Sequence, residues 1–268
     1  MGRRAPAGLL SVSATELLAI AEQAARAAGA LLRERFEAGG EQATGAKSTP
    51  TDLVSEADLA AERAIREIIA SRRPDDAILG EEGGETQQGS GLRWIVDPLD
   101  GTVNFLFGVP QWCVSVAVHD DDGGVAGVVY DPLRAELFAG VRGGVPTCNG
   151  VALRASRQTE LATALIATGF AYDAGVRARQ AAVVGRLLPR VRDVRRMGSA
   201  ALDAAWTAAG RYDAFYERGV QIWDTAAGEV LCLAAGLELR PLEAEGDLPA
   251  GIVVAPAGLI DELAGLVA

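Results

Sequence analysis

Residues 93–105, RWIVDPLDGTVNF, place the strongest constraint on what this chain can fold into. The apolar run at 94–96 predicts a buried strand, and two carboxylates, Asp97 and Asp100, follow it closely. Like charges beside an apolar core are costly unless a cation lies between them. The segment therefore predicts either a strand that delivers two acidic side chains to a cation, or a tight turn built from the common pairs Asp-Pro and Asp-Gly.

The net charge of the chain limits the classes of partner that it can bind. Its 268 residues are enough for one large domain or two closely packed halves, and its formal net charge is -11. This acidity argues against general nucleic-acid binding, which needs a basic surface. It also disfavours an enzyme of anionic substrates, unless cations mediate the contact.

Cysteine and histidine content favours a cytoplasmic protein without a zinc site. Cys113, Cys148 and Cys232 are scattered and form no Cys-x-x-Cys pair, which fits a reducing compartment better than a disulfide framework. His119 is the only histidine, so zinc sites built from clustered His and Cys are nearly excluded. The sequence has neither a long apolar run typical of a membrane span nor the apolar core of a signal peptide, so we expect no membrane partner.

The hydrophobic pattern mixes helices and strands along the whole chain, which predicts a mixed α/β (α+β) fold. A change of pattern near residue 155 predicts an N-terminal α+β half, 1–155, with most of the acidic motifs, and a C-terminal α/β half, 156–268. Helices are predicted at 13–36, from Ser55 onward, at 175–188, 199–210 and 223–236. Within 77–84 a short strand is predicted to run into an acidic turn, and further strands are predicted at 93–96, 164–170, 213–217 and 251–255, with two more within 112–132.

Three acidic sites fall where predicted elements start or stop. Glu81 and Glu82 follow one strand, Asp97 and Asp100 follow the next, and Asp224 stands at a helix start. Side chains at such ends can converge on one crevice, where Mg²⁺ would suit oxygen ligands and a substrate phosphate could complete its coordination. An acidic chain could bind an anion in this way. Each site alone also fits turn chemistry or, for Asp224, a helix N-cap.

Five blocks of the chain resemble the signature segments of the inositol monophosphatase family. They are KSTPTDLVSEAD (47–58), GEEGG (80–84), WIVDPLDGTVNF (94–105), RRMGSAALDAAWTAAGRYDAFYERG (195–219) and WDTAAGEVLCLAAG (223–236). The resemblance implies a magnesium-dependent, lithium-sensitive phosphatase with a layered α-β-α-β-α sandwich fold, usually assembled as a homodimer. It implies hydrolysis of myo-inositol monophosphate to myo-inositol and phosphate by direct attack of water.

The resemblance also implies roles for individual residues. Two to three Mg²⁺ ions per active site are expected. Their ligands would be Glu81, Asp97, the Leu99 carbonyl, Asp100 and Asp224. Glu81 and Thr102 would position and activate the attacking water, and Asp58 would support Thr102. Lys47 would lie near a third, loosely bound metal and the phosphate.

The substrate pocket in the C-terminal half is implied by the same resemblance. The backbone of Gly101 and Thr102 would hold phosphate oxygens, and the other residues would face substrate hydroxyls. The expected substrate-binding residues are Asp100, Gly101, Thr102, Gly198, Ser199, Ala200, Glu217 and Asp224. The chain departs from the family pattern at Ala234, where an acid usually stands, and we expect altered local packing there rather than lost chemistry. Arg195 and Arg196 are expected to serve a structural or interface role.

Other phosphatase mechanisms fit the residues less well. Cys148 to Arg154 formally matches the Cys-x₅-Arg pattern of cysteine phosphatases, but residues 151–153 read as a strand, whereas that loop needs a following helix. A covalent aspartyl-phosphate mechanism would need Asp-x-Asp spacing, and Asp97 and Asp100 are one residue too far apart.

Two questions stay open from the sequence. The substrate could be fructose 1,6-bisphosphate, histidinol phosphate or a 3′-phosphoadenosine nucleotide, although the Val103 position after Thr102 favours the inositol type. The chain could also act as a non-catalytic interaction protein on the same scaffold, but its complete set of acidic ligands argues for an enzyme.

Overall fold

The computed structural model describes residues 12–39, 45–46, 53–86 and 89–268. Lys47 lies outside these ranges, so its place near the phosphate stays a prediction.

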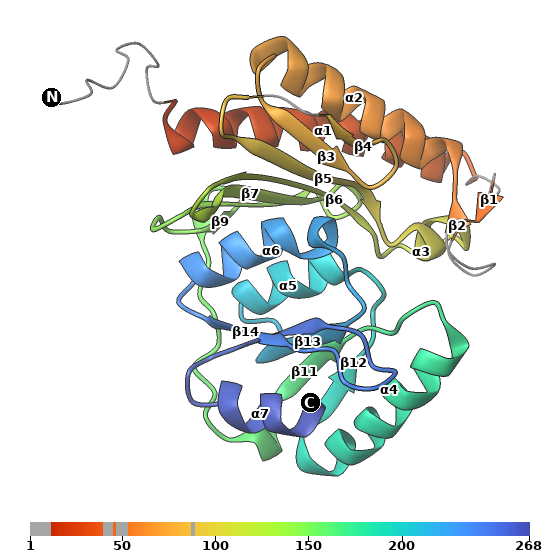
Figure 1. The fold of residues 1–268 in the computed structure, drawn as a ribbon, viewed down its shortest axis with the longest axis vertical. Helices are drawn as coiled ribbons and strands as arrows, with labels where there is room; N and C mark the ends of the chain where they lie inside the picture. Colours follow the sequence, from red (N-terminus) through yellow and green to blue (C-terminus); the bar gives the residue numbers. More distant parts are fainter. Residues whose placement is uncertain (1–11, 40–44, 47–52, 87–88) are drawn as a thin grey trace, which may run out of the picture.

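The secondary-structure elements form alternating layers, α-β-α-β-α, as predicted (Figure 1). One helix pair covers the outer face of an eight-stranded sheet, a second pair lies between this sheet and a five-stranded sheet, and a third covers the far face. In this order the pairs are α1 (Ala14–Glu37) and α2 (Glu56–Arg72), α5 (Ala200–Ala208) and α6 (Ile222–Ala234), and α4 (Ala174–Leu187) and α7 (Ile260–Val267).

The eight-stranded sheet is antiparallel except for one parallel pair, β3 and β5, which carries the acidic motifs. A hairpin, β1 (Gly45–Ala46) and β2 (Leu53–Val54), lies apart from it. In spatial order the strands of the sheet are β10 (Val151–Ala152), β9 (Thr147–Cys148), β8 (Glu136–Val141), β7 (Gly123–Asp131), β6 (Cys113–Asp120), β5 (Arg93–Asp100), β3 (Ala77–Gly80) and β4 (Gly84–Thr86).

The five-stranded sheet is built entirely from the C-terminal part of the chain. β11 pairs in parallel with both of its neighbours, and the remaining pairs are antiparallel. Its spatial order is β12 (Asp193–Arg195), β11 (Leu165–Thr168), β13 (Ala214–Arg218), β15 (Gly251–Ala255) and β14 (Glu238–Leu242). Two short 3₁₀ turns, η1 (Leu161–Thr163) and η2 (Leu188–Arg190), lie in its connections.

Small residues let the middle helices approach each other and the first sheet closely. A Cβ added at Gly228 of α6 would lie 2.5 Å from Cβ of Ala204 on α5, and one added at Gly127 of β7 would lie 2.7 Å from the carbonyl oxygen of Ala227. The core between the sheets accordingly combines side chains from both sides of residue 155, such as Phe138. The division of the chain at residue 155 stays a prediction.

The helices begin where the sequence places their caps. Ser13 precedes α1 and its hydroxyl accepts a hydrogen bond from the Glu16 backbone N–H. Ser55 precedes α2 and forms a reciprocal capping box with Asp58. No helix in the described ranges is long and apolar enough to cross a membrane.

Several predicted boundaries differ from the observed ones. Within 77–84 the predicted short strand and its acidic turn are β3 and residues 81–83, and the added feature is β4, which pairs back on β3 as a hairpin. The strand predicted at 93–96 continues to Asp100, with a register shift between Asp97 and Asp100 that accommodates the non-donating Pro98. Helices α3 (Thr102–Leu106) and α7 and strands β12 and β14 were not predicted.

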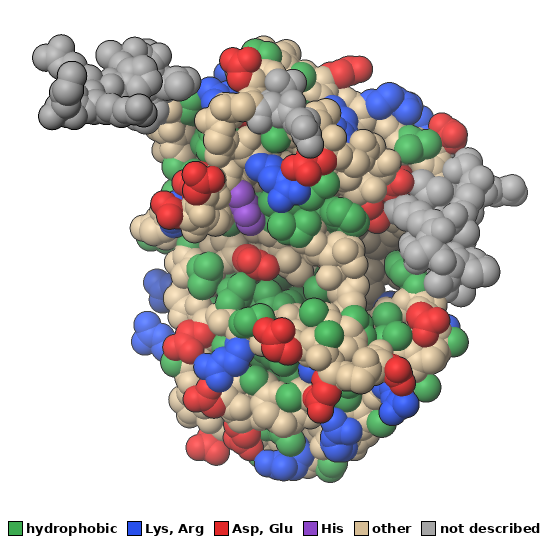
Figure 2. Space-filling view, in the orientation of Figure 1, with side chains coloured by type: hydrophobic (Ala, Val, Ile, Leu, Met, Phe, Trp, Pro, Cys, Tyr) green, Lys and Arg blue, Asp and Glu red, His purple; other side chains and the backbone are tan. Residues whose placement is uncertain are grey.

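The surface in view carries both signs of charge. Figure 2 shows Lys and Arg side chains interspersed with Asp and Glu, without one continuous basic area on this face.

Candidate active site

A cavity of about 480 Å³ opens where the ends of β3, β5 and β13 meet the first turns of α3, α5 and α6. Two arginines, Arg196 and Arg218, also line it. The acidic residues that line it are Glu81, Asp97, Asp100, Asp173, Glu217 and Asp224. The three acidic sites thus converge on one crevice, as predicted.

Parallel pairing brings Glu81 and Asp97 together. Gly80 on β3 is opposite Val96 on β5, and the Glu81 backbone N–H donates to the Val96 carbonyl at 3.2 Å. The residue that follows each of these positions is therefore an acid, and, besides burial, the Glu81 carboxylate is close enough to raise the pKa of Asp97 by repulsion. This adjacency follows from strand register, because the carboxyl ends of parallel strands meet at one edge.

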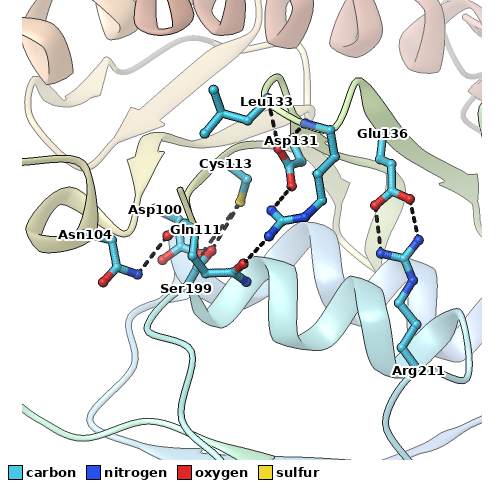
Figure 3. A network of polar contacts seen from close by, with 10 residues as sticks. Asp100, Asn104, Gln111, Cys113, Asp131, Leu133, Glu136, Ser199 and Arg211 are labelled. Atoms are coloured by element: carbon cyan, nitrogen blue, oxygen red, sulfur yellow. Dashed lines mark hydrogen bonds and ion pairs between the residues drawn. The ribbon is translucent and has the colours of Figure 1, made fainter. Parts of the chain in front are cut away.

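Asp100 joins the first sheet to the middle helices. Its Oδ2 accepts hydrogen bonds from the Ser199 hydroxyl at 2.6 Å and from the Ala201 N–H at 2.7 Å, and its Oδ1 accepts from the Ala200 N–H at 3.3 Å. These N–H groups form the first turn of α5, where a negative charge is favoured. Figure 3 shows Asp100 and Ser199 with the Cys113 thiol beside them.

Thr102 stands one residue beyond a left-handed glycine. Gly101 has φ +98°, and a Cβ there would lie 2.9 Å from the Gln111 carbonyl oxygen, so only glycine fits. The Thr102 hydroxyl lies 3.0 Å from Asp58 Oδ1 and 3.0 Å from the Leu99 carbonyl oxygen. Asp58 is fixed in turn because its Oδ2 accepts from the backbone N–H and the hydroxyl of Ser55.

Asp224 and Glu217 form the opposite wall. Asp224 lies in the first turn of α6, and its Oδ2 accepts a 2.6 Å hydrogen bond from the Gln221 N–H. Glu217 lies near the end of β13, and its carboxyl group occupies the space above Gly169. A Cβ added at Gly169 would lie 2.0 Å from Glu217 Oε1, so this glycine provides the room for the acid.

Asn104 connects two of the sequence blocks. Its side-chain N–H₂ donates to the Gln111 carbonyl at 2.7 Å and to the Met197 carbonyl at 2.9 Å, and so holds the loop that presents Gly198 to the cavity. Gln111 continues the network, because its Oε1 accepts a 3.0 Å hydrogen bond from Arg134 (Figure 3). Asn104 is not among the predicted site residues, although it lies within the WIVDPLDGTVNF block.

Burial and mutual repulsion make the acids hard to ionise together. Burial, followed by repulsion from Glu81, Asp100 and Asp224, raises the pKa of Asp97 well above its usual value. Burial and then Asp100 do the same to the pKa of Asp224. Burial and then Asp100 raise the pKa of Glu217 to about 8, against an opposing effect of Arg196. A bound cation would relieve this repulsion.

The donor chemistry fits a hard divalent cation. Carboxylate and carbonyl oxygens are the ligands that Mg²⁺ prefers, and no histidine or thiolate lines the described cavity. Within the described ranges, no three Asp, Glu, His or Cys side chains already form a ready-made cage for an ion. One reason is that Asp100 and Asp224 direct oxygens to protein N–H and O–H donors.

The predicted site residues fall into three groups. Those that line the cavity are Glu81, Asp97, Leu99, Asp100, Gly101, Thr102, Gly198, Ala200, Glu217 and Asp224. Asp58 and Ser199 lie behind the wall, where each holds a lining residue by a hydrogen bond. Lys47 lies outside the described residues. The ion-binding and catalytic roles of all of them stay proposals.

The cavity includes residues that the sequence analysis missed. Phe170, Tyr172 and Asp173 follow β11 and form one rim. Arg196, expected in a structural or interface role, also lines the cavity, with its guanidinium 5.8 Å from the centre of the Phe170 ring. Arg196 directly precedes Met197 and Gly198 in a signature block, and this position in the sequence could have indicated that it lines the cavity.

The cysteine-phosphatase pattern is not a phosphate-binding loop. Cys148 and Val151 belong to the short hairpin of β9 and β10, and residues 153–160, which follow it, form no helix. Burial, and then repulsion from Glu136, raises the pKa of the Cys148 thiol, which disfavours a nucleophilic thiolate.

Comparison with known proteins gives one consistent result. Residues 13–267 match the model of the "Inositol monophosphatase family". The chain is 43% identical over 267 residues to an inositol-1-monophosphatase of Mycobacterium leprae, covering 92% of each protein. It is 41% identical over 222 residues to the Nus factor SuhB of Escherichia coli K12, covering 82% of this chain and 83% of that protein.

Solved structures agree with the sequence comparisons. The crystal structure of the extragenic suppressor protein suhB from Bartonella henselae superposes with a TM-score of 0.85 at 34% identity, covering 94% of this chain and 98% of that one. The structure therefore confirms the predicted layered fold, and the similar proteins confirm the predicted enzyme family. With both the sequence blocks and the full-length fold in agreement, this chain belongs to the inositol monophosphatase family.

Proposed function

We propose that this protein hydrolyses myo-inositol monophosphate to myo-inositol and phosphate with Mg²⁺ bound in the cavity. The observation that carries the proposal is that Glu81, Asp97, Asp100 and Asp224 line the same cavity as Thr102. Family membership and the name of the Mycobacterium leprae relative support the same substrate class.

The ligand set would be the four carboxylates and the Leu99 carbonyl. When bound, Mg²⁺ would neutralise the repulsion among these groups, offset the charge of the phosphate and polarise the ester and the water. The resemblance suggests two to three ions, and their number is part of the proposal.

Glu81 and Thr102 would hold and activate the attacking water. The Thr102 hydroxyl can donate to only one acceptor at a time, and its contact with Asp58 Oδ1 at 3.0 Å would leave its lone pairs directed to the water. Glu81 would accept the proton of the water as a general base. Asp58 would act through Thr102 and not on the substrate.

The rest of the cavity would bind the ester. The backbone of Gly101 and Thr102, together with Lys47, would hold the phosphate. Glu217 and Asp224 would accept hydrogen bonds from ring hydroxyls, for which carboxylates are suited. Gly198, Ser199 and Ala200 would contribute main-chain contacts, since the Ser199 hydroxyl is directed to Asp100.

Phosphate release from a substrate panel tests the proposal. Inositol 1-phosphate, fructose 1,6-bisphosphate, histidinol phosphate and 3′-phosphoadenosine 5′-phosphate are each assayed with Mg²⁺, with EDTA and with added lithium. We expect metal-dependent release that is fastest for inositol 1-phosphate and is suppressed by lithium. Faster release from another ester would overturn the substrate, and release that persists in EDTA would overturn the mechanism as well.

Fructose 1,6-bisphosphate is the second candidate because of Arg196. This guanidinium lines the cavity and could pair with a second phosphate group, which inositol 1-phosphate lacks. Replacement of Arg196 by Gln should lower kcat/KM for the bisphosphate more than for the monophosphate if that candidate is correct.

A second, non-catalytic role is suggested by the relatives named Nus factor SuhB. The variant Asp97→Asn separates the two roles, because it removes a proposed metal ligand and leaves the surface unchanged. We expect the variant to fold but to lose at least about a hundredfold in turnover, the upper range seen when a group that only supports a metal ligand is lost. A cellular phenotype that persists in this variant would support the binding role.

Assembly and location are also part of the proposal. The resemblance suggests a homodimer, which sedimentation of the purified chain would test. A cytoplasmic location is suggested by the unpaired cysteines and would be tested by fractionation of the source cells.

A further inference from the structure

Helix α2 presents three polar side chains in one row toward the active site. Asp58, Glu62 and Arg66 are spaced four residues apart, so they lie on the same helix face. Asp58 is fully buried and contacts Thr102. Glu62 is only 3% exposed, which is unusual for a glutamate and requires that its carboxylate be paired.

The Glu62 carboxylate binds the turn between β3 and β4. Its Oε2 accepts a 2.8 Å hydrogen bond from the Glu82 N–H, and its Oε1 accepts one of 2.8 Å from the Gly83 N–H. Arg66 Nε donates to the same Oε1 at 2.6 Å. Arg66 Nη2 donates to the Gly84 carbonyl at 2.6 Å, so the pair holds both sides of the turn.

Two glycines, Gly80 at the end of β3 and Gly83 in the turn, leave room for this carboxylate. A Cβ added at Gly80 would lie 2.4 Å from Glu62 Oε1, and one added at Gly83 would lie 2.6 Å from the same atom. Neither glycine has a positive φ, so backbone conformation does not explain them. The close approach of Glu62 does.

The residue that the turn presents to the cavity is Glu81. It is the first of the three turn residues, and the next two donate their N–H groups to Glu62. Charge-assisted hydrogen bonds to two consecutive amides fix the peptide planes that follow Glu81, and hence the direction of its side chain. In the same row, Asp58 fixes Thr102.

We propose that the Glu62–Arg66 pair is a positioning device that sets Glu81 for metal binding and water activation. The inference rests on the proposed function, because the roles of Glu81 in metal binding and water activation are part of that proposal. It assigns to one helix face the alignment of both water-activating residues, Glu81 through Glu62 and Thr102 through Asp58. Glu62 itself does not line the described cavity, so it acts through the turn.

The test uses Glu62→Gln in the full chain, with Glu37→Gln as the matched control. Glu37 forms an ion pair with Arg33 at the same i,i+4 spacing and at 2.7 Å, but both of these side chains are exposed on the surface of α1. Binding of Mn²⁺ without substrate is measured by paramagnetic resonance of the free ion. We expect the Mn²⁺ dissociation constant of Glu62→Gln to rise about ten- to a hundredfold, the range found when groups that orient metal ligands are removed.

Two further readouts separate positioning from general destabilisation. Deuterium exchange of the peptide that contains Glu82 and Gly83 should become at least about tenfold faster, because hydrogen bonds to a charged acceptor are lost. At saturating metal, kcat should fall while KM for inositol 1-phosphate stays unchanged. If Glu62→Gln does not fold, Arg66→Gln is compared in its place, with smaller changes expected in the same directions.

The possible failures are distinguishable. A wild-type chain without metal-dependent phosphate release overturns the proposed function before any variant is compared. An active wild type, together with unchanged Mn²⁺ affinity and kcat in Glu62→Gln, overturns only the positioning role, even if exchange of the turn is faster. Equal changes in Glu37→Gln would also overturn it, because they would reflect the loss of any helix ion pair.

Discussion

The Ser199 hydroxyl donates a 2.6 Å hydrogen bond to Oδ2 of Asp100, across 99 positions of sequence. Both side chains are buried, and the bond ties the end of β5 to the first turn of α5. A proposed metal ligand is therefore also the link between the first sheet and the middle helix layer. Assembly of the cavity and packing of α5 against the first sheet depend on the same contact.

Replacement of Ser199 by Ala should lower the free energy of unfolding by about 1–3 kcal/mol, because a buried hydrogen bond to a charged acceptor is lost. The measurement is urea unfolding in EDTA. Ser71→Ala is the control, since its hydroxyl donates to the Ile68 carbonyl on an exposed part of α2. An equal loss in both variants would contradict the link.

The acidic site could be predicted from sequence because local rules place its members. Carboxylates that directly follow the segments 77–80 and 93–96 must emerge at one edge once these segments pair in parallel, and Asp224 follows from a helix start. The partners of these residues could not be predicted in this way. Glu62 and Asn104 contact loops that are distant in sequence, and no local sequence pattern predicts such a contact.

The missed elements have a similar physical explanation. β14 contains Pro241 and two charged residues and is an edge strand of the second sheet, so its sequence lacks the apolar alternation of a buried strand. α3 is only five residues long and starts at the left-handed Gly101, which reads as a turn. In both cases the packed neighbours, and not local preference, decide the structure.

The Thr102 hydroxyl should be essential to turnover, whereas its methyl group should not. Thr102→Val keeps the shape but removes the contact with Asp58, and should lower kcat by roughly a hundred- to ten-thousandfold, the range for a lost proton-transfer group. Thr102→Ser should retain activity within about tenfold, since it keeps the hydroxyl. Steady-state phosphate release measures both. Similar rates in the Val and Ser variants would exclude a role for the hydroxyl.

The stability of the metal-free protein should fall as the pH rises from about 4.5 to about 8, in part because of Glu217. Burial, and then Asp100, raise the pKa of this group from 4.5 to about 8, so the folded state holds a proton that the unfolded state releases in this window. The Glu217 contribution is therefore complete below the lower limit and lost above the upper one.

The difference between the wild type and Glu217→Gln isolates this contribution from the other buried acids. Urea unfolding in EDTA at several pH values should show the variant gaining stability relative to the wild type as the pH rises. A difference that is constant across the window would mean that Glu217 ionises normally in the folded state.

Gly169 should control substrate affinity although it does not line the described cavity. In Gly169→Ala the new Cβ would lie 2.0 Å from Glu217 Oε1, and the flexible carboxyl end can rotate away at small cost to the fold. The Glu217 carboxyl group would then no longer face the substrate hydroxyl. Because loss of a hydrogen bond that leaves a buried partner unsatisfied costs about 1–3 kcal/mol, KM for inositol 1-phosphate should rise at least about fivefold. Gly185→Ala is the control, because a Cβ there meets no atom within 4 Å. An unchanged KM in Gly169→Ala would show that Glu217 does not contact the bound ester, and the substrate pocket would then have to be assigned to the other wall of the cavity.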